Sequence, residues 1–167
     1  IMQQLRQPRN GGSDGLCDLA KIVDENKKLF REEVYCPIAM HISIRNPEYA
    51  RFVETVVDRS VRCAFVTQHA DDRETLNRLI KQHNIPGIRC INYAGGTRTD
   101  YSPPVPSAQL AKFGILSYMD ELFDAPEVVK WVLNDTAKLH QIAFGDLTAE
   151  QQANNEAIFN AGVQMLV

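Results

Sequence analysis

The fold is decided by the stretch IAMHISIRNPE, residues 38–48. Its first part places an apolar side chain at every second position, which is the pattern of a half-buried β-strand. The apolar positions are Ile38, Met40, Ile42 and Ile44. The next three residues, Asn46-Pro47-Glu48, are typical of a helix start, because asparagine caps, proline suits the first turn and an acid suits the positive end of the helix. We therefore predict a strand that is followed directly by a helix.

Strands and helices continue to alternate after this stretch. The apolar spacing predicts a helix over 49–57, a strand over 61–67, a helix over 71–83 and a strand over 88–94. The run Asn84-Ile85-Pro86-Gly87 ends the second of these helices. Because strands and helices alternate, we expect an α/β lobe with at least some parallel strand pairing.

A loop rich in glycine and proline follows, over residues 95–107. It opens with Gly95-Gly96 and contains three prolines near its end, so it cannot be a helix and does not suit a central strand. We place the internal boundary there. The expected domains are a first lobe over 36–94 and a second lobe over 108–167.

The second lobe has a less regular pattern. We expect a short helix over 107–113, a helix that starts at Pro126-Glu127 and a strand over 139–144. A capping box at Thr148 predicts a helix to about Asn160, and residues 163–167 begin a strand that the sequence does not finish. Residues 115–123 are apolar and fit either a strand or a helix.

The part of the chain before the first lobe divides into two segments. Residues 1–17 hold several glycines and no apolar period, which predicts a flexible linker or loop. Asp18 can cap a helix, and apolar residues then recur on one face through Tyr35. The fold class that we expect is mixed α/β (α+β), with two lobes of strands and helices behind an N-terminal helix.

Composition narrows the class of protein. The 167 residues are 44% hydrophobic and 23% charged, as in a globular domain, and the net charge is −3. A clearly basic domain, the usual footprint of nucleic-acid binding, is absent. We see no apolar run of about 18 residues that could cross a bilayer, and the start at Ile1 without a signal-peptide pattern suggests a fragment of a longer protein.

The four cysteines are far apart in the sequence, at positions 17, 36, 63 and 90. They form no CxxC pair, and the histidines lack metal-ligand spacing, so we expect no metal site. Cys63 and Cys90 lie in apolar runs, which suits buried free thiols in a reducing compartment, the cytosol or the nucleus.

An enzyme would need a catalytic or phosphate-binding group of residues. Gly95-Gly96-Thr97-Arg98 follows a predicted strand, and its backbone N–H groups could approach a phosphate. It lacks the Gly-Lys-Ser/Thr of a P-loop and the three spaced glycines of a dinucleotide site. The four histidines are scattered and no nucleophile motif accompanies them. We expect no catalytic residues and no cofactor, and keep a small α/β nucleotide- or phosphate-binding enzyme at Gly95-Gly96 as the alternative.

A local group of residues offers a contact for single-stranded DNA. Arg98, Tyr101 and Lys112 lie in or near the long loop, where charge and ring stacking could hold a strand. Asp100 partly cancels the positive charge. These three residues are the candidate DNA contacts.

Three stretches carry a family resemblance. They are Asn26 to Ile38, Ile42 to Glu54, and KFGILSYMDELFDAP at 112–126, the most specific of the three. In this order they resemble the hinge domain of structural maintenance of chromosomes (SMC) proteins, and the fifth eukaryotic member in particular. The resemblance covers approximately residues 20–167.

The resemblance implies a fold and a role. An SMC hinge has two pseudo-equivalent lobes and joins a partner hinge, which here would be that of the sixth member. It lies at one end of a long coiled coil, and the ATPase head lies at the other end. Residues 18–35 would be the end of the incoming coil. The resemblance also implies a nuclear, chromosome-associated protein that acts in chromosome maintenance and DNA repair. It further implies that DNA, notably single-stranded DNA, binds near the hinge. The glycine-rich interface signature of other hinges is not evident in this sequence, so no dimer-interface residue is assigned.

Elementary chemistry supports the same role. A lobe with a small sheet leaves an edge strand whose backbone groups can pair with another chain. Docking of a second protein would satisfy those groups and bury apolar surface. We therefore expect a module that holds a partner protein rather than an enzyme.

Overall fold

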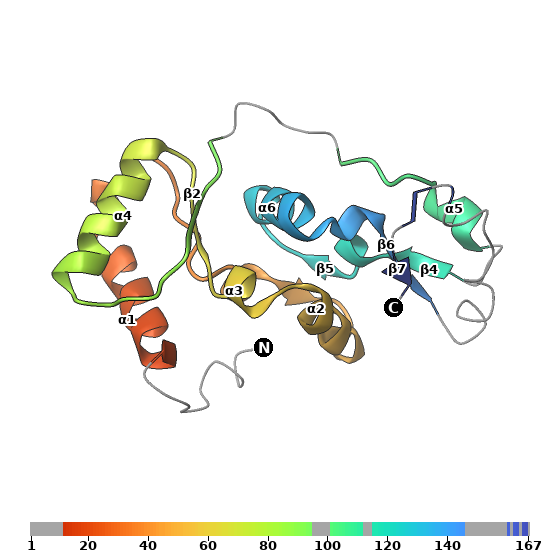
Figure 1. Ribbon diagram of the computed structural model, residues 1–167, viewed down its shortest axis with the longest axis horizontal. Coiled ribbons are helices and arrows are strands. Elements are labelled where there is room, and N and C mark those ends of the chain that lie inside the picture. Colours follow the sequence, from red (N-terminus) through yellow and green to blue (C-terminus); the bar gives the residue numbers. More distant parts are fainter. Residues whose placement is uncertain are drawn as a thin grey trace. The chain divides into compact units, whose positions relative to one another are not determined.

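The structure is a computed structural model that describes residues 12–94, 101–111, 115–145, 160, 162–163 and 165–166 (Figure 1). The chain forms two compact units. The first combines Ile1–Ile42 with Asp58–Arg98, and the second combines Ser43–Val57 with Thr99–Val167. No helix in the described part of the chain is both long and apolar enough to cross a membrane.

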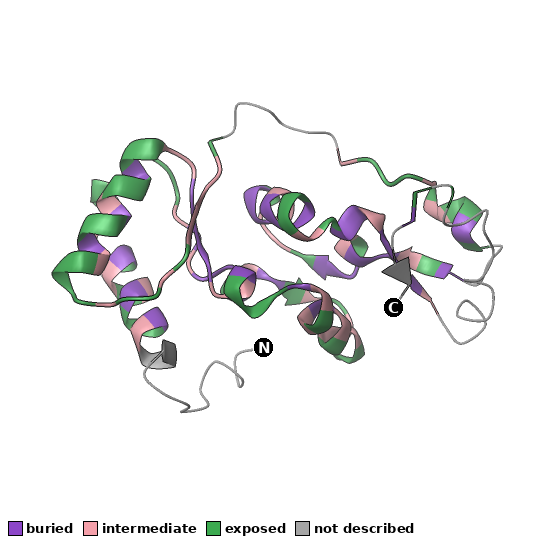
Figure 2. Cartoon of the chain, in the orientation of Figure 1, coloured by how far each residue is buried: buried purple, intermediate pink, exposed green. Residues whose placement is uncertain are grey.

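The first unit is built around two helices and a pair of strands. Helix α1 (Gly12–Glu25) and helix α4 (Ala70–Gln82) lie side by side, next to strands β2 (Phe65–Thr67) and β3 (Cys90–Asn92). The core residues are Leu16, Leu19 and Val23 of α1, Phe65 of β2 and Leu76 of α4. Each helix buries one stripe and exposes the rest (Figure 2).

Strands β2 and β3 are parallel, with Phe65 opposite Cys90 and Thr67 opposite Asn92. The α4 crossover makes this pairing possible, because parallel neighbours need a long connection. On the other side of β2, Tyr35 forms an antiparallel bridge with Val66 through two backbone hydrogen bonds of 3.0 and 2.8 Å. The predicted helix over 71–83 and the predicted parallel pairing are confirmed.

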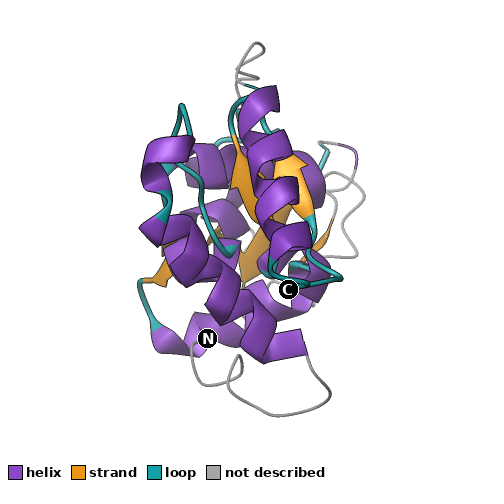
Figure 3. Cartoon of the chain, turned by 90° about the vertical axis from the view of Figure 1, so that its left-hand side faces the viewer, coloured by secondary structure: helices purple, strands orange, loops and turns teal. Residues whose placement is uncertain are grey.

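The second unit holds a mixed sheet. Strands β4 (Ile115–Tyr118), β6 (Ile142–Gly145) and β7 (Met165–Leu166) follow the order β4-β6-β7, antiparallel and then parallel. A separate antiparallel pair joins β1 (Ser43–Ile44) to β5 (Phe123–Asp124). The strands are short compared with the helices (Figure 3). The expected mixed α/β class is confirmed.

Helices and turns cover the core of this second unit. The longer helices are α2 (Ala50–Val56) and α6 (Glu127–Ala137), and the single turns are η4 (Pro47–Tyr49), α5 (Ser107–Leu110), η6 (Met119–Glu121) and η7 (Leu139–Gln141). One buried cluster consists of Leu110, Ile115, Tyr118, Ala143 and Val163. Helix α6 begins at Glu127 after Pro126, as the sequence predicts.

Residues 43–57 belong to the second unit, although the sequence placed them in a first lobe over 36–94. The reason is a set of long-range contacts. The guanidinium of Arg45 binds the carboxylate of Asp124 in a bidentate pair, at 2.8 and 3.1 Å. The rings of Tyr49 and Phe52 pack against Phe144, with centroids 4.8 and 4.9 Å apart. The compact units therefore differ from the predicted linear division.

The predicted strand over 38–44 is wrong for most of its length. Residues Ile38–His41 form a 3₁₀ helix, η3, and only Ser43–Ile44 are extended. Alternation fails because Ala39 is buried whereas Met40 is 49% exposed. Similar short helical turns replace the first residues of two other predicted strands: α3 (Arg59–Arg62) precedes β2, and η7 precedes β6. The left-handed backbone of Lys138, with φ 53°, introduces the second of these turns.

The N-terminal helix lies earlier in the sequence than predicted. It spans Gly12–Glu25, so part of the expected linker is helical, and the predicted continuation through Tyr35 is absent. The helix ends where the Asn26 side chain donates to the carbonyl of Ile22 at 2.8 Å. A Cβ at position 15 would lie 2.9 Å from Ile85 Cγ2, so any residue larger than glycine there would force the Ile85 side chain to shift. Apart from a 3₁₀ turn, η2 (Lys27–Leu29), the chain is then non-helical until η3.

Candidate interaction surfaces

The structure describes only one residue of the predicted DNA-binding group, Tyr101. Arg98 and Lys112 lie outside the described residues, as does the Gly95-Gly96 loop. Tyr101 is half-buried, and its ring faces that of His140 with centroids 5.0 Å apart. Tyr101 therefore already has an aromatic neighbour within its own unit.

Two of the four histidines hold the backbone of the first unit in place. His41 Nε2 accepts a hydrogen bond from the backbone N–H of Cys36 at 3.1 Å, and burial lowers the pKa of His41. His69 Nδ1 accepts from the N–H of Asp71 at 3.1 Å, and this bond caps α4. These contacts account for both rings without a catalytic role.

The other two histidines also lie at structural positions. His83 is the C-cap residue of α4 and is exposed. His140 is 6% exposed, and its Nδ1 has no hydrogen-bond partner among the described residues. Burial lowers the pKa of His140, and Asp120 opposes this effect. Burial also raises the pKa of Asp120, whose carboxylate accepts from the Asn134 amide at 3.3 Å.

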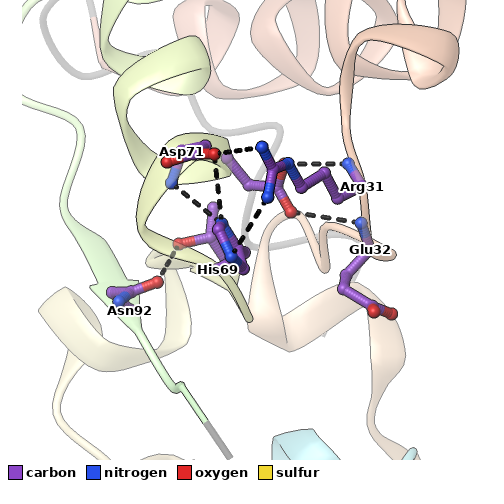
Figure 4. A network of polar contacts seen from close by, with 7 residues as sticks. Arg31, Glu32, His69, Asp71 and Asn92 are labelled. Carbon is purple, nitrogen blue, oxygen red and sulfur yellow. Dashed lines mark hydrogen bonds and ion pairs between the residues drawn. The ribbon is translucent and has the colours of Figure 1, made fainter.

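The paired acids at the start of α4 form a clamp rather than a catalytic dyad (Figure 4). Asp72 is 1% exposed, and its two carboxylate oxygens accept from the backbone N–H groups of Arg31 and Glu32, at 2.8 and 3.1 Å. The guanidinium of Arg31 also pairs with Asp71 at 2.6 Å and lies 3.5 Å from His69. No group of acids, cysteines and histidines suited to a metal occurs in the described part of the chain.

Strand β3 leaves one border of the first unit's sheet open. It pairs with β2 on one side, and no described strand pairs with its other side. Its three residues, Cys90, Ile91 and Asn92, are each half-buried. Backbone groups along such a border can pair with a second chain.

Strand β4 leaves a second open border, in the second unit, because no strand in the described part of the chain pairs with its outer side. It is the outer strand of the order β4-β6-β7. Ile115 pairs with Gly145 and Ser117 with Phe144, so Leu116 is the extra residue of a β-bulge. Leu116 is 59% exposed, the highest value among the exposed large hydrophobic residues of the described chain.

The sequence did not single out Leu116, because residues 115–123 fitted both a strand and a helix. The burial of its neighbours in the structure is what sets Leu116 apart. Ile115 and Tyr118 are buried, whereas Leu116 points outward between them. We therefore take the β4 border with Leu116 as the candidate interaction surface of the second unit.

Comparison with known proteins shows what the chain is similar to in sequence. No family model matches the chain. It is 31% identical to structural maintenance of chromosomes protein 5 of Arabidopsis thaliana over 160 residues, which cover 96% of this chain and 15% of that protein. The chain therefore spans a small part of the curated relative's length.

Solved structures share the fold. The chain matches a crystal structure of the S. pombe Smc5/6 hinge domain with a TM-score of 0.78 and 21% identity, over 95% of this chain and 60% of that one. It also matches the hinge domain of Geobacillus stearothermophilus SMC, crystallised as an asymmetric dimer, with a TM-score of 0.58 and 11% identity, over 95% and 61%.

Proposed function

Because this chain has the fold of an SMC hinge domain and is similar in sequence to SMC protein 5, we propose that it is the module through which an SMC protein pairs with a partner hinge. The partner is the hinge of the sixth member, and the pair works on chromosomes in the nucleus, in chromosome maintenance and DNA repair. The module performs no reaction of its own.

The observation that carries this proposal is the exposed Leu116 on the open border of β4. A partner strand along β4 would complete the backbone hydrogen bonds of the sheet. Full burial of a leucine side chain contributes about 1.5–3 kcal/mol. The open border of β3 offers a second edge. When a partner binds one edge, the effective concentration of its second binding segment at the other edge rises, and the complex is tighter than with one edge alone.

Light scattering tests the pairing. We expect the chain mixed with the partner hinge to form a one-to-one complex at micromolar concentration. Leu116→Lys should weaken the complex at least about tenfold, since it removes apolar burial and places a charge at the border. Leu29→Lys is the matched control, because Leu29 is also an exposed apolar residue, at 49%, and belongs to the first unit, which does not contain β4.

Two outcomes distinguish the pairing role from the assignment of β4 as the interface. A monodisperse monomer in the presence of the partner hinge would refute the pairing role. A wild-type complex that Leu116→Lys leaves intact would keep the role and reject β4 as the interface.

Contact with single-stranded DNA is the second function that we propose, through Arg98, Tyr101 and Lys112. The support is the charge and ring chemistry of the sequence, with Tyr101 only half-buried. Binding should weaken steeply with salt, because cations on the protein displace counterions from phosphates. Arg98→Glu should reduce the affinity measured by fluorescence anisotropy, and an unchanged affinity and salt dependence would refute the assignment.

A further inference from the structure

The proline-rich segment over residues 101–106 has a feature that neither open sheet border uses. Its sequence is YSPPVP, and it belongs to no helix or strand. Ser102 is followed directly by Pro103. The chain contains eight prolines, and this is the one position where a proline follows a serine or a threonine.

The side chain of Ser102 is available for a reaction. The residue is exposed, and its hydroxyl forms no hydrogen bond within the described part of the chain. Other serines are engaged: Ser60 Oγ accepts from the guanidinium of Arg89 at 3.0 Å, and Ser107 Oγ donates to Glu121 at 3.2 Å. A group added to Ser102 therefore breaks no contact that the described structure contains.

The residues on both sides of Ser102 are fixed to the second unit. The ring of Tyr101 faces that of His140, with centroids 5.0 Å apart. The N–H and the carbonyl of Val105 both bond the Tyr118 hydroxyl, at 3.2 and 2.8 Å. Because these anchors hold the two ends of the segment, Ser102 is presented at the surface between them.

Pro103 sets the backbone conformation of Ser102. A residue before a proline is restricted to the extended region, because the proline ring clashes with a helical neighbour. Proline also has no N–H, so an enzyme pocket without an acceptor at that place favours proline over residues that would leave an N–H unsatisfied. An exposed, extended serine before a proline thus has the chemistry that proline-directed protein kinases select.

We propose that Ser102 is phosphorylated by a proline-directed protein kinase and that the phosphate weakens binding of single-stranded DNA. Ser102 Oγ attacks the γ-phosphorus of ATP bound to the kinase. The new O–P bond forms as the bond between that phosphorus and the oxygen bridging to the β-phosphorus breaks, so ADP leaves. The hydroxyl proton goes to the catalytic aspartate of the kinase.

The effect on DNA follows from charge and rests on the DNA contact proposed above. A phosphoserine carries a charge of about −1.5 to −2 at pH 7. It would adjoin Tyr101, the ring of that contact, and offset the two cations assigned to it. The net charge of the chain is already −3. Phosphates of the DNA would therefore be repelled, and fewer counterions would be released on binding.

Ser60 is the strongest competing site, and its surroundings argue against it. It is exposed and lies between two arginines, a sequence that arginine-directed kinases select. Its hydroxyl is bound by Arg89, and its backbone N–H donates to Asp58 at 2.6 Å in the first turn of α3. A kinase would have to unwind that turn to bind Ser60 as an extended segment. Ser102 lies in no helix.

Mass spectrometry after treatment with a proline-directed kinase and MgATP tests the modification. The chain, alone and in complex with the partner hinge, should gain one phosphate, on Ser102. Pro103→Ala should slow the reaction at least about tenfold, because the enzyme selects for the missing N–H. Pro104→Ala is the matched control: Pro104 is also exposed, and its replacement leaves the Ser-Pro pair intact.

Fluorescence anisotropy with a labelled single-stranded oligonucleotide tests the consequence. At low salt the phosphorylated chain should bind at least about fivefold more weakly than the untreated chain, with a salt slope smaller by about 1. Ser102→Ala should keep its affinity after kinase treatment. Ser102→Glu should weaken binding, whereas Thr55→Glu should not, since it adds the same charge at an exposed position of α2 in the second unit, outside the proposed contact.

Different results would overturn different parts of the proposal. Phosphate only on other residues, an unchanged rate in Pro103→Ala, or modification of the free chain but not of the complex would reject Ser102 as the site. Phosphorylated Ser102 with unchanged DNA affinity and salt dependence would reject the regulation. If the untreated chain binds no single-stranded DNA, the DNA function fails together with its regulation, whereas mass spectrometry still decides the modification.

Discussion

The hydroxyl of Tyr118 donates a hydrogen bond to the backbone carbonyl of Val105 at 2.8 Å and accepts one from the N–H of the same residue at 3.2 Å. Tyr118 is fully buried at the end of β4, whereas Val105 lies among the prolines before α5. One side chain thus satisfies both backbone groups of a loop residue and fastens that loop to the strand that bears Leu116.

Tyr118→Phe should lower the free energy of unfolding of the second unit by about 1–3 kcal/mol, because the N–H and carbonyl of Val105 lose their partner. The chain has one tryptophan, Trp131, in α6 of the same unit, so its fluorescence during urea unfolding measures this quantity. Tyr49→Phe is the matched control: its ring packs on Phe144, and no hydroxyl hydrogen bond is removed there among the described residues. A Tyr118→Phe effect as small as that of the control would contradict the prediction.

Removal of the Asp72 clamp should loosen residues 31 and 32. Asp72→Ala deprives two backbone N–H groups of their acceptor, so their amide hydrogens should exchange faster and the first unit should lose about 1–3 kcal/mol of stability. Hydrogen exchange followed by NMR gives the residue-level measurement. Asp71→Ala removes exposed contacts with Arg31 and His69 and should cost at most about 1 kcal/mol. Equal exchange in wild type and Asp72→Ala would refute the clamp.

Thiol chemistry should distinguish two cysteines of the first unit. Cys17 is exposed, whereas burial raises the pKa of Cys36 to about 11. Because the thiolate is the nucleophile, iodoacetamide at neutral pH should modify Cys17 and spare Cys36, which should react only as the pH approaches 11. Mass spectrometry of proteolytic fragments locates the modified residue. Rapid modification of Cys36 at neutral pH in the folded chain would show that the thiol is not buried.

Local signals in the sequence were sufficient for the first unit's central motif. The acids at Asp71 and Asp72 and the stop at Asn84 define α4, which the structure contains with a crossover between parallel strands. Both signals act within a few residues, so no tertiary knowledge is needed to interpret them.

Long-range contacts explain what could not be predicted. The transfer of residues 43–57 to the second unit depends on the pairing of Arg45 with Asp124, 79 positions away. The alternating pattern at 38–44 predicted a strand, but residues Ile38–His41 form a short 3₁₀ helix. Contacts with neighbouring elements decide which of these side chains are buried, and the local pattern does not contain those contacts. The border position of Leu116 required the strand order, which no local pattern contains.

Burial of His140 should make the second unit sensitive to acid. The ring is 6% exposed and its Nδ1 lacks a described partner, so protonation would place a charge where the protein solvates it poorly. Burial lowers the pKa of His140 in the folded state below its ordinary value of 6.5, and Lys138 adds to this effect whereas Asp120 opposes it. The unfolded chain therefore binds a proton at a higher pH than the folded chain does.

By linkage, the stability that the neutral His140 ring contributes is complete above pH 6.5 and is lost as the pH falls toward the lowered folded-state pKa. Asp120 acts in the opposite sense at lower pH, because burial raises its pKa above 3.8 and the folded state takes up that proton first. Urea unfolding monitored by Trp131 fluorescence at several pH values should show the loss below 6.5. His140→Gln should flatten this dependence, whereas His83→Gln, at an exposed position, should not. An unchanged slope in His140→Gln would assign the acid sensitivity to other groups.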